Sequence, residues 1–515
     1  MALPINPRAL RPSQVVQLLN STPLGAVLTE RQLHRHRARA GFRIGDGRTI
    51  DLLRYVAWMV GQRHTVAAAP PAPELTGYDA YKERQRQRMA EQSLSGRDIT
   101  NGAWVHRPLD PPRKIRAARD LRFFLEAYLP ASFPLPWSPD HLKVITKLEH
   151  AVLEGGLFAM AMPRGSGKTT LCEGACLWAL SYGHREFAAL IGATEPHAEE
   201  MLESIKSELE NNELLEADFS EVVGPIRALE GIHQRASGQL YQGRQTHIGW
   251  TARDVVLPTL LLSDWLEHAD CRPFLHRDGR TLASGAAVRV AGLTGRVRGM
   301  KHKRTDGTSI RPALVLIDDP QTEESARSPS QCAARERILA GAILGLAGPG
   351  RKIAGLMTLT VICPGDLADR LLDRDKHPQW QGERTKMVYA FPKHEALWTQ
   401  YGELRRQAQQ EQLSASDVAQ RCNEFYRAHQ AELEAGAVVA WPARHDPDEV
   451  TAIQHAMNLR IDRKDHAFFA EYQNEPLPID PVGADELTAD EIAAKVNGHA
   501  HGIDGQRLVL VLREE

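Results

Sequence analysis

The pattern of hydrophobic and polar residues changes along the chain, and one long part extends from about Arg116 to Pro478. In that part, stretches with apolar residues at helical spacing alternate with short apolar runs typical of buried strands. Five runs stand out: LFAMAM (157–162), FAALIGA (187–193), VRVAGL (288–293), ALVLID (313–318) and KIAGLMTLTV (352–361). Helices that alternate with such strands predict a mostly parallel sheet wrapped by helices. We therefore expect an α/β fold here.

Residues 1–64 show a pattern of helical segments separated by turns, and they are predicted to form a small, basic helical module. Thr29 has the sequence context of an N-cap, and Gly41 that of a C-cap. The module looks like a helix-turn-helix or winged helix. Its three helical segments are RPSQVVQLLN (11–20), TERQLHRHRARAG (29–41) and TIDLLRYVAWMV (49–60).

A linker is expected over residues 65–115. VAAAPPAPEL (66–75) is rich in alanine and proline and has no periodicity, whereas YDAYKERQRQRMAEQ (78–92) predicts a charged helix without an apolar stripe. The α/β domain is then expected to span residues 116–480, and a C-terminal segment residues 481–515.

The composition and the sequence patterns argue against a disordered, a membrane-spanning or a secreted protein. The hydrophobic fraction is 42%, the charged fraction 25% and the formal net charge −2, which are ordinary values for globular proteins. No apolar run approaches the ~20 residues that cross a bilayer, and MALPINPRAL at the start has no signal-peptide pattern. The six cysteines lack zinc or redox spacing, so we expect reduced thiols, a cytoplasmic location and no membrane contact.

The segment PRGSGKTT (163–170) joins a predicted strand to a predicted helix. This context predicts a phosphate-binding loop, in which backbone N–H groups close around the phosphates of ATP, Lys168 reaches them and Thr169 binds Mg²⁺. The tripeptide Gly167-Lys168-Thr169 alone is a weak signal, and Met162 stands where such loops usually open with glycine. The residues expected to bind the nucleotide are Pro163, Arg164, Gly165, Ser166, Gly167, Lys168, Thr169 and Thr170.

An acidic strand end supplies the second half of the predicted site. ALVLIDDP (313–320) ends an apolar run in Asp318 and Asp319. We expect Asp318 to hold Mg²⁺ together with Thr169, and Asp319 to orient or deprotonate the attacking water. The alternative is a buried strand whose acids only cap a loop.

These motifs resemble one family, the large terminase subunits of tailed bacteriophages and prophages, which are ATPases that pump DNA into capsids. Their phosphate loops often replace the first glycine and carry an arginine, as PRGSGKTT does with Arg164. The resemblance implies that Arg164 stabilises charge on the γ-phosphate. MTLTVICPGDLADRLL (357–372) is similar to the family's coupling motif, so Thr360, followed by Asp366, would sense that phosphate. His141 would lie on the adenine side.

The resemblance implies a P-loop NTPase of the ASCE class that uses ATP and Mg²⁺. Its partners would be double-stranded DNA, further copies of the chain in a ring, a capsid portal and a small terminase subunit, in the cytoplasm of a bacterial host. Family members continue into an RNase H-like nuclease. Only about thirty residues follow Asp485, and RLVLVLREE at the end contains no aspartate. We therefore expect residues 481–515 to be a truncated start of that domain, and an ATPase that does not cleave DNA.

Two basic clusters are candidates for DNA contact. The first lies at i, i+4 spacing on one side of a predicted helix and comprises Arg31, Arg35 and Arg39. The second lies in RVAGLTGRVRGMKHKR (289–304), which resembles an arginine–glycine segment of the family, and comprises Arg296, Arg298, Lys301, Lys303 and Arg304. Members of the second cluster could instead reach a neighbouring subunit's nucleotide or form an ordinary surface loop.

Two other functions stay open at this point. One is a different nucleic-acid motor of the same superclass, such as a helicase. The other is a DNA-binding and docking protein of a prophage whose ATPase has become inactive. The intact segments GSGKTT and LIDDP argue against the second alternative, whereas the missing nuclease argues for it.

Overall fold

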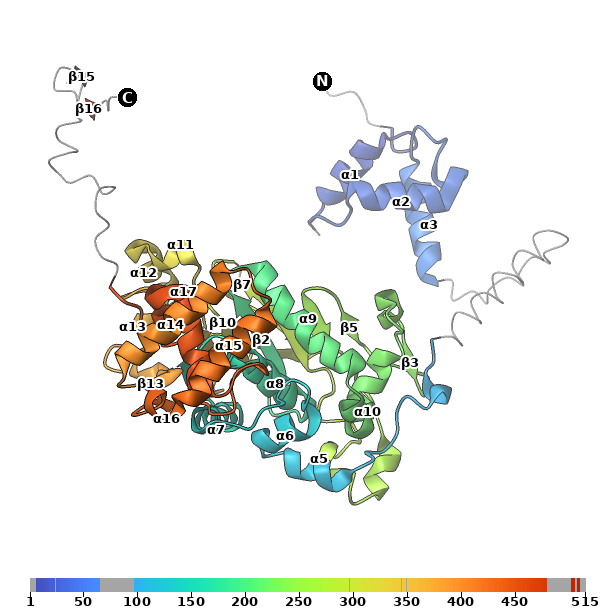
Figure 1. The fold of residues 1–515 in the computed structure, drawn as a ribbon. Helices are drawn as coiled ribbons and strands as arrows, with labels where there is room; N and C mark the ends of the chain where they lie inside the picture. Colours follow the sequence, from blue (N-terminus) through green and yellow to red (C-terminus); the bar gives the residue numbers. More distant parts are fainter. Residues whose placement is uncertain are drawn as a thin grey trace. The chain divides into compact units, whose positions relative to one another are not determined.

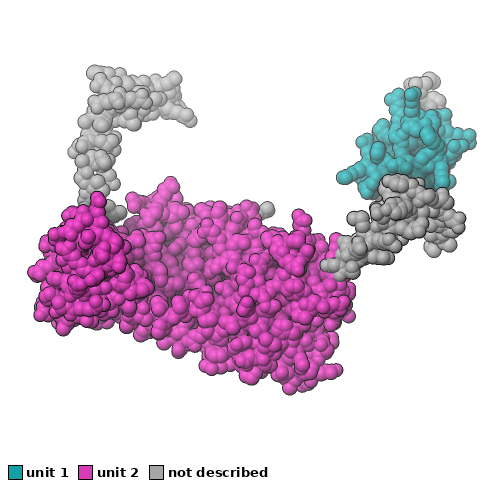
Figure 2. All heavy atoms as spheres, turned by 45° about the vertical axis from the view of Figure 1, so that its right-hand side comes forward, with its two compact units in different colours: residues 1–92 teal, residues 93–515 magenta. Residues whose placement is uncertain are grey.

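A computed structural model gives the fold of two compact units, residues 1–92 and residues 93–515 (Figure 2). All six cysteines are free and buried. The structure describes residues 6–23, 25–64, 97–295, 297–343, 345–348 and 350–478, with two short strands at 502–504 and 507–509.

The first unit contains the three predicted helices, α1 (Pro12–Asn20), α2 (Glu30–Ala40) and α3 (Leu52–His64), with a 3-10 turn η1 (Gly41–Ile44) after α2 (Figure 1). The Thr29 side chain accepts a hydrogen bond from the Gln32 N–H, and Gly41 ends α2 with φ of 56°, so both predicted caps are confirmed. The buried core consists of Leu10, Val15, Leu28, Leu33, Ala40, Ile44, Ile50 and Tyr55.

The second unit is built on an eight-stranded sheet in the order β12-β1-β11-β10-β2-β7-β6-β5. The five predicted runs form its five central strands, which pair in parallel, and β5 and β6 add an antiparallel edge. The predicted α/β fold with a mostly parallel sheet is therefore confirmed. The strands are β1 (Gly156–Ala161), β2 (Phe187–Gly192), β5 (Gly249–Trp250), β6 (Asp254–Val256), β7 (Ala287–Gly292), β10 (Leu314–Asp318), β11 (Ala354–Leu359) and β12 (Glu383–Arg384).

Helices cover both faces of this sheet, because each central strand buries side chains on both sides. In β1, Phe158 and Met160 join one core, whereas Leu157 and Ala159 join the other. The first core is completed by α6 (Leu121–Tyr128), α7 (Pro139–Glu154), α8 (Lys168–Ser181), α9 (Glu195–Asn211) and α10 (Glu213–Arg227), and the second by α12 (Pro329–Ile338), the π-helical turn η6 (Leu339–Ile343) and α13 (Leu367–Leu372).

A third core belongs to the helices between residues 395 and 471, drawn in orange and red in Figure 1. Trp398, Tyr401 and Tyr426 pack against one another at its centre. The last helix is kinked at Lys464, whose φ is 63°. The elements around this core are β13 (Val388–Ala390), α14 (Glu395–Gln410), α15 (Ala415–Ala428), α16 (Gln430–Leu433), β14 (Val438–Val439) and α17 (Ala452–Glu471).

Shorter elements connect these layers. They are η2 (Thr100–Gly102), α5 (Pro111–Ala117), η3 (His233–Ala236), β3 (Leu240–Tyr241), β4 (Arg244–Gln245), η4 (Ser263–Glu267), η5 (Arg272–Phe274), β8 (His302–Lys303), β9 (Ser309–Ile310), α11 (Glu323–Ala326) and η7 (Pro378–Trp380). Near the C-terminus, β15 (Gly502–Asp504) and β16 (Arg507–Val509) pair with each other. The rest of the C-terminal segment 481–515 lies outside the described residues.

Residues 97–115 differ from the expected linker because they are part of the second unit and pack against its helix α10. The Asp110 N–H donates to Asp218 Oδ1 at 2.8 Å, and the buried Lys114 Nζ pairs with Glu221 at 2.6 Å. The helix α5 therefore crosses the expected boundary at residue 116. Residues 65–96, with the predicted charged helix, lie outside the described residues. Among the residues that the structure describes, no helix has the length and apolarity needed to cross a bilayer.

Candidate functional site

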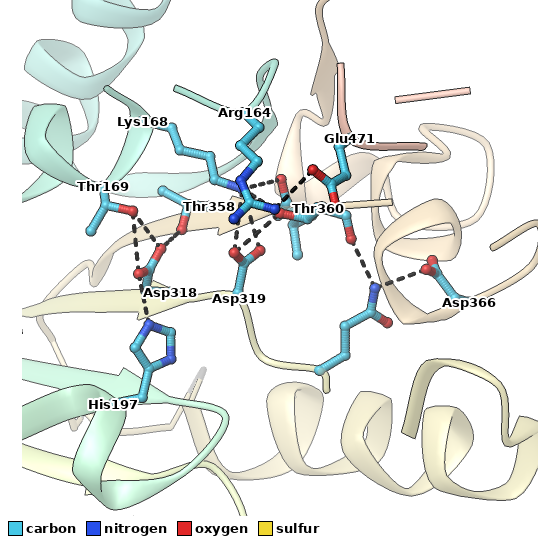
Figure 3. Close-up of polar contacts among 12 residues, drawn as sticks. Arg164, Lys168, Thr169, His197, Asp318, Asp319, Thr358, Thr360, Asp366 and Glu471 are labelled. Atoms are coloured by element: carbon cyan, nitrogen blue, oxygen red, sulfur yellow. Dashed lines mark hydrogen bonds and ion pairs between the residues drawn. The ribbon is translucent and has the colours of Figure 1, made fainter. Parts of the chain in front are cut away.

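The carboxyl ends of four neighbouring strands meet at one edge of the sheet (Figure 3). Parallel strands point the same way, so the residues that follow them gather at a common edge. β1 leads into residues 162–167, β10 ends at Asp318, β11 is followed by Thr360, and β2 is followed by α9, which carries His197. The order β1-β11-β10-β2 brings these four segments together.

Residues 162–167 form a loop that leads directly into α8. Gly165 and Gly167 have φ values of 75° and 76°, which glycine adopts without the strain that a side chain would add. Because α8 begins at Lys168, its unpaired N–H groups and the positive end of its dipole lie at this loop. Such a helix N-terminus favours an anionic group.

Lys168 lies at the centre of a polar network (Figure 3). Its Nζ donates to the Leu359 carbonyl oxygen at 3.1 Å and to the Thr360 hydroxyl, and it pairs with Asp319 Oδ2 at 3.3 Å. The Thr360 hydroxyl donates to the same carboxylate at 3.1 Å. The ion pair is longer than the ~2.7–2.9 Å of a tight charge-assisted hydrogen bond. Lys168 is thus oriented without being tightly neutralised.

Asp318 is buried, with contacts on both carboxylate oxygens. Thr358 donates to Oδ1, the Thr169 hydroxyl lies 3.1 Å from Oδ1, and His197 Nε2 lies 3.2 Å from Oδ2. Burial favours a higher pKa for this carboxyl, but the hydrogen bonds from His197 and Thr358 and the charge of Lys168 outweigh it and lower the pKa. Asp318 is therefore an ionised carboxylate beside a hydroxyl. These two oxygen donors fit Mg²⁺.

Asp319 has an unusual backbone conformation. Its φ is 36°, in the left-handed region that residues other than glycine enter at a cost in energy. The Asp319 N–H donates to the Thr358 carbonyl oxygen at 3.2 Å. The side chain contacts Lys168 and Thr360 and lines the adjoining cavity. The strained backbone therefore presents a carboxylate to the open space.

The cavity has a volume of about 800 Å³, which is within the range of small-molecule sites. Asp319 and Thr360 line it, whereas Asp318 is not among its lining residues. Pro163 and Ser166 line a much smaller neighbouring pocket instead. The other residues predicted to bind the nucleotide all line the cavity: Arg164, Gly165, Gly167, Lys168, Thr169 and Thr170.

Arg164 lines the cavity but contacts a residue that sequence reasoning missed. Its Nη1 pairs with Glu471 Oε2 at 2.8 Å (Figure 3). Glu471 is the last residue of α17 and lies 307 positions further along the chain. No local motif marks it. The contact expected between Arg164 and a γ-phosphate stays a prediction.

Thr360 and Asp366, the two positions of the predicted coupling motif, are joined through Gln321. The Gln321 amide donates to the Thr360 carbonyl oxygen at 2.9 Å and to Asp366 Oδ2 at 2.8 Å. Asp366 also caps α13, because its side chain accepts from the Asp369 N–H at 2.8 Å. A change at Thr360 can therefore reach α13 through a single side chain.

His141, expected near an adenine, supports the loop and lines the small pocket that Pro163 and Ser166 also line. It is buried on α7, where its Nε2 lies 3.0 Å from the Ser166 carbonyl oxygen and its Nδ1 2.7 Å from the Ser138 hydroxyl. Burial lowers the pKa of this imidazole, which favours the neutral form. Trp441 packs against its edge at 4.5 Å between ring centroids.

Sequence reasoning also missed His197 and Gln321, although both follow strand ends. His197 lies five positions after the end of β2, and Gln321 three positions after the end of β10. The general tendency of functional groups to follow the carboxyl ends of parallel strands could have marked both. The hydrogen bond to Asp318 raises the pKa of His197, so the imidazolium form is favoured while that carboxylate is ionised.

Most of the described basic residues proposed for DNA contact are exposed. On α2, Leu33 and Ala40 face the core, whereas Arg31, Arg35 and Arg39 face solvent. In the second unit, Arg298, Lys301 and Lys303 are exposed and do not line the large cavity. Arg304 is half-buried and pairs with Glu186 at 3.0 Å. Arg296 lies outside the described residues.

Comparison with models of known protein families and with curated proteins finds no match for this chain. The residues at the sheet edge and their geometry are therefore the basis for proposing a function.

Proposed function

We propose that this chain binds ATP with Mg²⁺ at the sheet edge and hydrolyses it. The observation that carries the proposal is the meeting of a glycine loop, a helix N-terminus, Lys168 and two strand-end aspartates at one edge of the sheet, beside a cavity that Lys168 and Asp319 line. This combination matches what phosphoryl transfer requires, namely fixed positive charge, a metal site and a group that positions water. We further propose that the fold is a P-loop NTPase fold of the ASCE class.

Each residue has a role in this proposal. The loop amides and Lys168 bind the β- and γ-phosphates, and Arg164 stabilises charge that develops on the γ-phosphate. Thr169 and Asp318 would hold Mg²⁺, which neutralises phosphate charge when bound. Asp319 orients the attacking water and accepts its proton, and Lys168 moves from that carboxylate to the phosphates. Thr360 reports the state of the phosphate to α13 through Gln321.

We propose that hydrolysis drives movement of double-stranded DNA, as in the large terminase subunits that the motifs resemble. The resemblance is also the basis for proposing a ring of identical subunits, a capsid portal and a small terminase subunit as partners. Among the residues of this chain itself, the exposed arginines of α2 support DNA contact. Three guanidinium groups in a row along one helix face suit a phosphate backbone. A helicase-type motor would separate strands, and a strand-displacement assay distinguishes it.

ATP hydrolysis tests the enzymatic proposal. Turnover of the purified chain with Mg²⁺, with and without duplex DNA, is compared with Lys168→Ala and Asp319→Asn. We expect each variant to lose about 10²–10³-fold in rate, because each lacks a group that acts on the transition state. Asp373→Asn is the matched control, since that carboxylate pairs only with Lys376, at 2.9 Å, among the described residues. If the native chain is folded but hydrolyses ATP no faster than Lys168→Ala, the result would favour the inactive, DNA-docking alternative.

Salt dependence tests the DNA proposal separately. Replacing Arg31, Arg35 and Arg39 together by alanine is expected to weaken duplex binding and to reduce the log–log salt slope by about 0.9 for each lost phosphate contact. The control is the triple replacement of Arg8, Arg43 and Arg54, which are also exposed in the first unit and lie off α2. Equal slopes for the two triple variants would contradict a specific role for α2.

A further inference from the structure

Arg164 is held through three contacts, two of them with Glu471 at the end of α17 and one with Arg444 in the segment before α17. Its guanidinium pairs with Glu471 Oε2 at 2.8 Å, and its N–H donates to the Glu471 carbonyl oxygen at 2.8 Å. Arg444 Nη2 donates to the Arg164 carbonyl oxygen. Among the described residues, Glu471 is the only ion-pair partner of Arg164. The arginine of the loop is therefore attached to a group of helices that packs around a separate core.

The ion pair between Arg164 and Glu471 contributes little to the stability of the fold, and its members can exchange partners. The side chains are 64% and 29% exposed, and exposed pairs contribute little to folding because water screens them. Glu471 is also the last residue of α17, where the negative end of the helix dipole disfavours a carboxylate. Arg164 offsets that repulsion. A phosphate group in the cavity carries more negative charge than a carboxylate and accepts from a guanidinium through several oxygens.

The segment that carries Glu471 follows a kink and forms a wall of the cavity. Lys464 interrupts α17 with φ of 63° and ψ of 161°, a conformation that is strained for a residue with a side chain. Beyond the kink, His466, Ala467, Ala470 and Glu471 line the same cavity as Arg164 and Lys168. A change in the partner of Arg164 would therefore be felt by this last part of α17.

We propose that Glu471 is a positioning residue that holds Arg164 until a triphosphate fills the cavity and takes the arginine from it. The inference rests on the proposed nucleotide site. In the first state Arg164 pairs with Glu471, and in the second it pairs with phosphate while Glu471 loses its partner. By linkage, nucleotide weakens the contact between the loop and α17, and displacement of α17 frees Arg164 for phosphate.

Nucleotide affinity of Glu471 variants tests the inference. The probe is ATPγS with Mg²⁺, titrated by calorimetry into the full chain. We expect Glu471→Gln to bind about two- to fivefold more tightly than the native chain, because the cost of breaking the ion pair is removed. Glu471→Asp retains the charge on a shorter side chain, and we expect a smaller gain of the same sign. Glu475→Gln is the charge control, since Glu475 pairs with Lys386 at 2.6 Å and does not line the cavity.

A double-mutant cycle distinguishes the positioning role from simple repulsion of the triphosphate. We expect the gain from Glu471→Gln to be larger with Arg164 present than in an Arg164→Gln background. Repulsion alone predicts the opposite, because without Arg164 the carboxylate has lost its ion-pair partner and repels the triphosphate more strongly. A gain at least as large in the Arg164→Gln background, or no gain from Glu471→Asp, would overturn the inference and leave the nucleotide site standing. Absence of saturable binding by the folded native chain would overturn both.

Discussion

The second unit contains two lysine–carboxylate clusters that have the same chemistry and opposite surroundings. In the first, Lys114 is 1% exposed, pairs with Glu221 at 2.6 Å and donates to the Asp218 carbonyl oxygen at 2.7 Å. In the second, Lys168 pairs with Asp319 at 3.3 Å beside an open cavity of about 800 Å³. The first cluster is closed by its own partners, whereas the second has room for a ligand.

The surroundings explain the difference. Lys114 Nζ also lies 4.4 Å from the ring centroids of Phe219 and Phe274, so the ammonium is enclosed by a carboxylate, a carbonyl group and two aromatic faces. Lys168 stands at a helix N-terminus, beside a carboxylate on a strained backbone. A charge pair that is enclosed fixes α5 against α10, and one that is exposed to a cavity can exchange partners.

The largest expected effect concerns the open cluster. We expect Asp318→Asn to lower Mg²⁺-dependent ATP hydrolysis by about 10²–10³-fold, because an amide is a poor replacement for an anionic metal ligand. Initial rates over a Mg²⁺ titration measure the loss, and partial recovery at high Mg²⁺ would support weakened metal binding. Full activity of this variant at low Mg²⁺ would remove Asp318 from the proposed metal site.

The closed cluster is expected to control stability. Glu221→Gln leaves the Lys114 ammonium buried without its carboxylate, so we expect a loss of about 3–5 kcal/mol in the free energy of unfolding. Chemical denaturation measures it. The double variant Lys114→Met, Glu221→Leu is expected to recover most of the loss, because it removes both charges. If Glu221→Gln instead unfolds at the same denaturant concentration as the native chain, the Lys114–Glu221 pair contributes no stability.

Glu173 shows how burial changes the pKa of a carboxyl group that has no basic partner among the described residues. Its only hydrogen bond among the described residues comes from the Ser204 hydroxyl at 2.7 Å. Burial raises its pKa to about 7. Since the folded pKa lies above the unfolded one, the associated stability is complete below about pH 4.5 and is lost as the pH rises through about 7.

We therefore expect Glu173→Gln to gain stability relative to the native chain as the pH rises from 5 to 8, by an amount on the order of 1 kcal/mol. Thermal or chemical unfolding of both proteins across this range measures the difference. A difference between the two proteins that does not change with pH would show that Glu173 is ionised at low pH in the folded state.

The smallest expected effect is on stability at the open cluster. Lys168→Ala is expected to change the free energy of unfolding by no more than about 1 kcal/mol, because the Lys168–Asp319 pair is long and borders the cavity. Denaturation beside Glu221→Gln makes the contrast direct. A loss for Lys168→Ala as large as that for Glu221→Gln would mean that both lysines act as structural charges.

Contiguous motifs made the sheet edge predictable. Lys168 and Thr169 follow β1 after the loop 162–167, whereas Asp318 ends β10 and Asp319 follows it. Parallel strands bring such residues together whatever their separation in the sequence. The contact between Arg164 and Glu471 could not be found in this way, because it depends on how α17 packs more than 300 residues later. Lys114 and Glu221 were missed for the same reason, since their pairing joins α5 to α10 across 107 positions.

The central claim is that the open cluster, and not the closed one, binds a nucleotide. Thermal unfolding with and without Mg²⁺ and ATP tests it in three proteins: the native chain, Lys168→Ala and Glu221→Gln. We predict that nucleotide raises the midpoint of the native chain and of the folded, less stable Glu221→Gln variant, and that the rise is absent in Lys168→Ala. No rise in the native chain, or an equal rise in Lys168→Ala, would contradict the account.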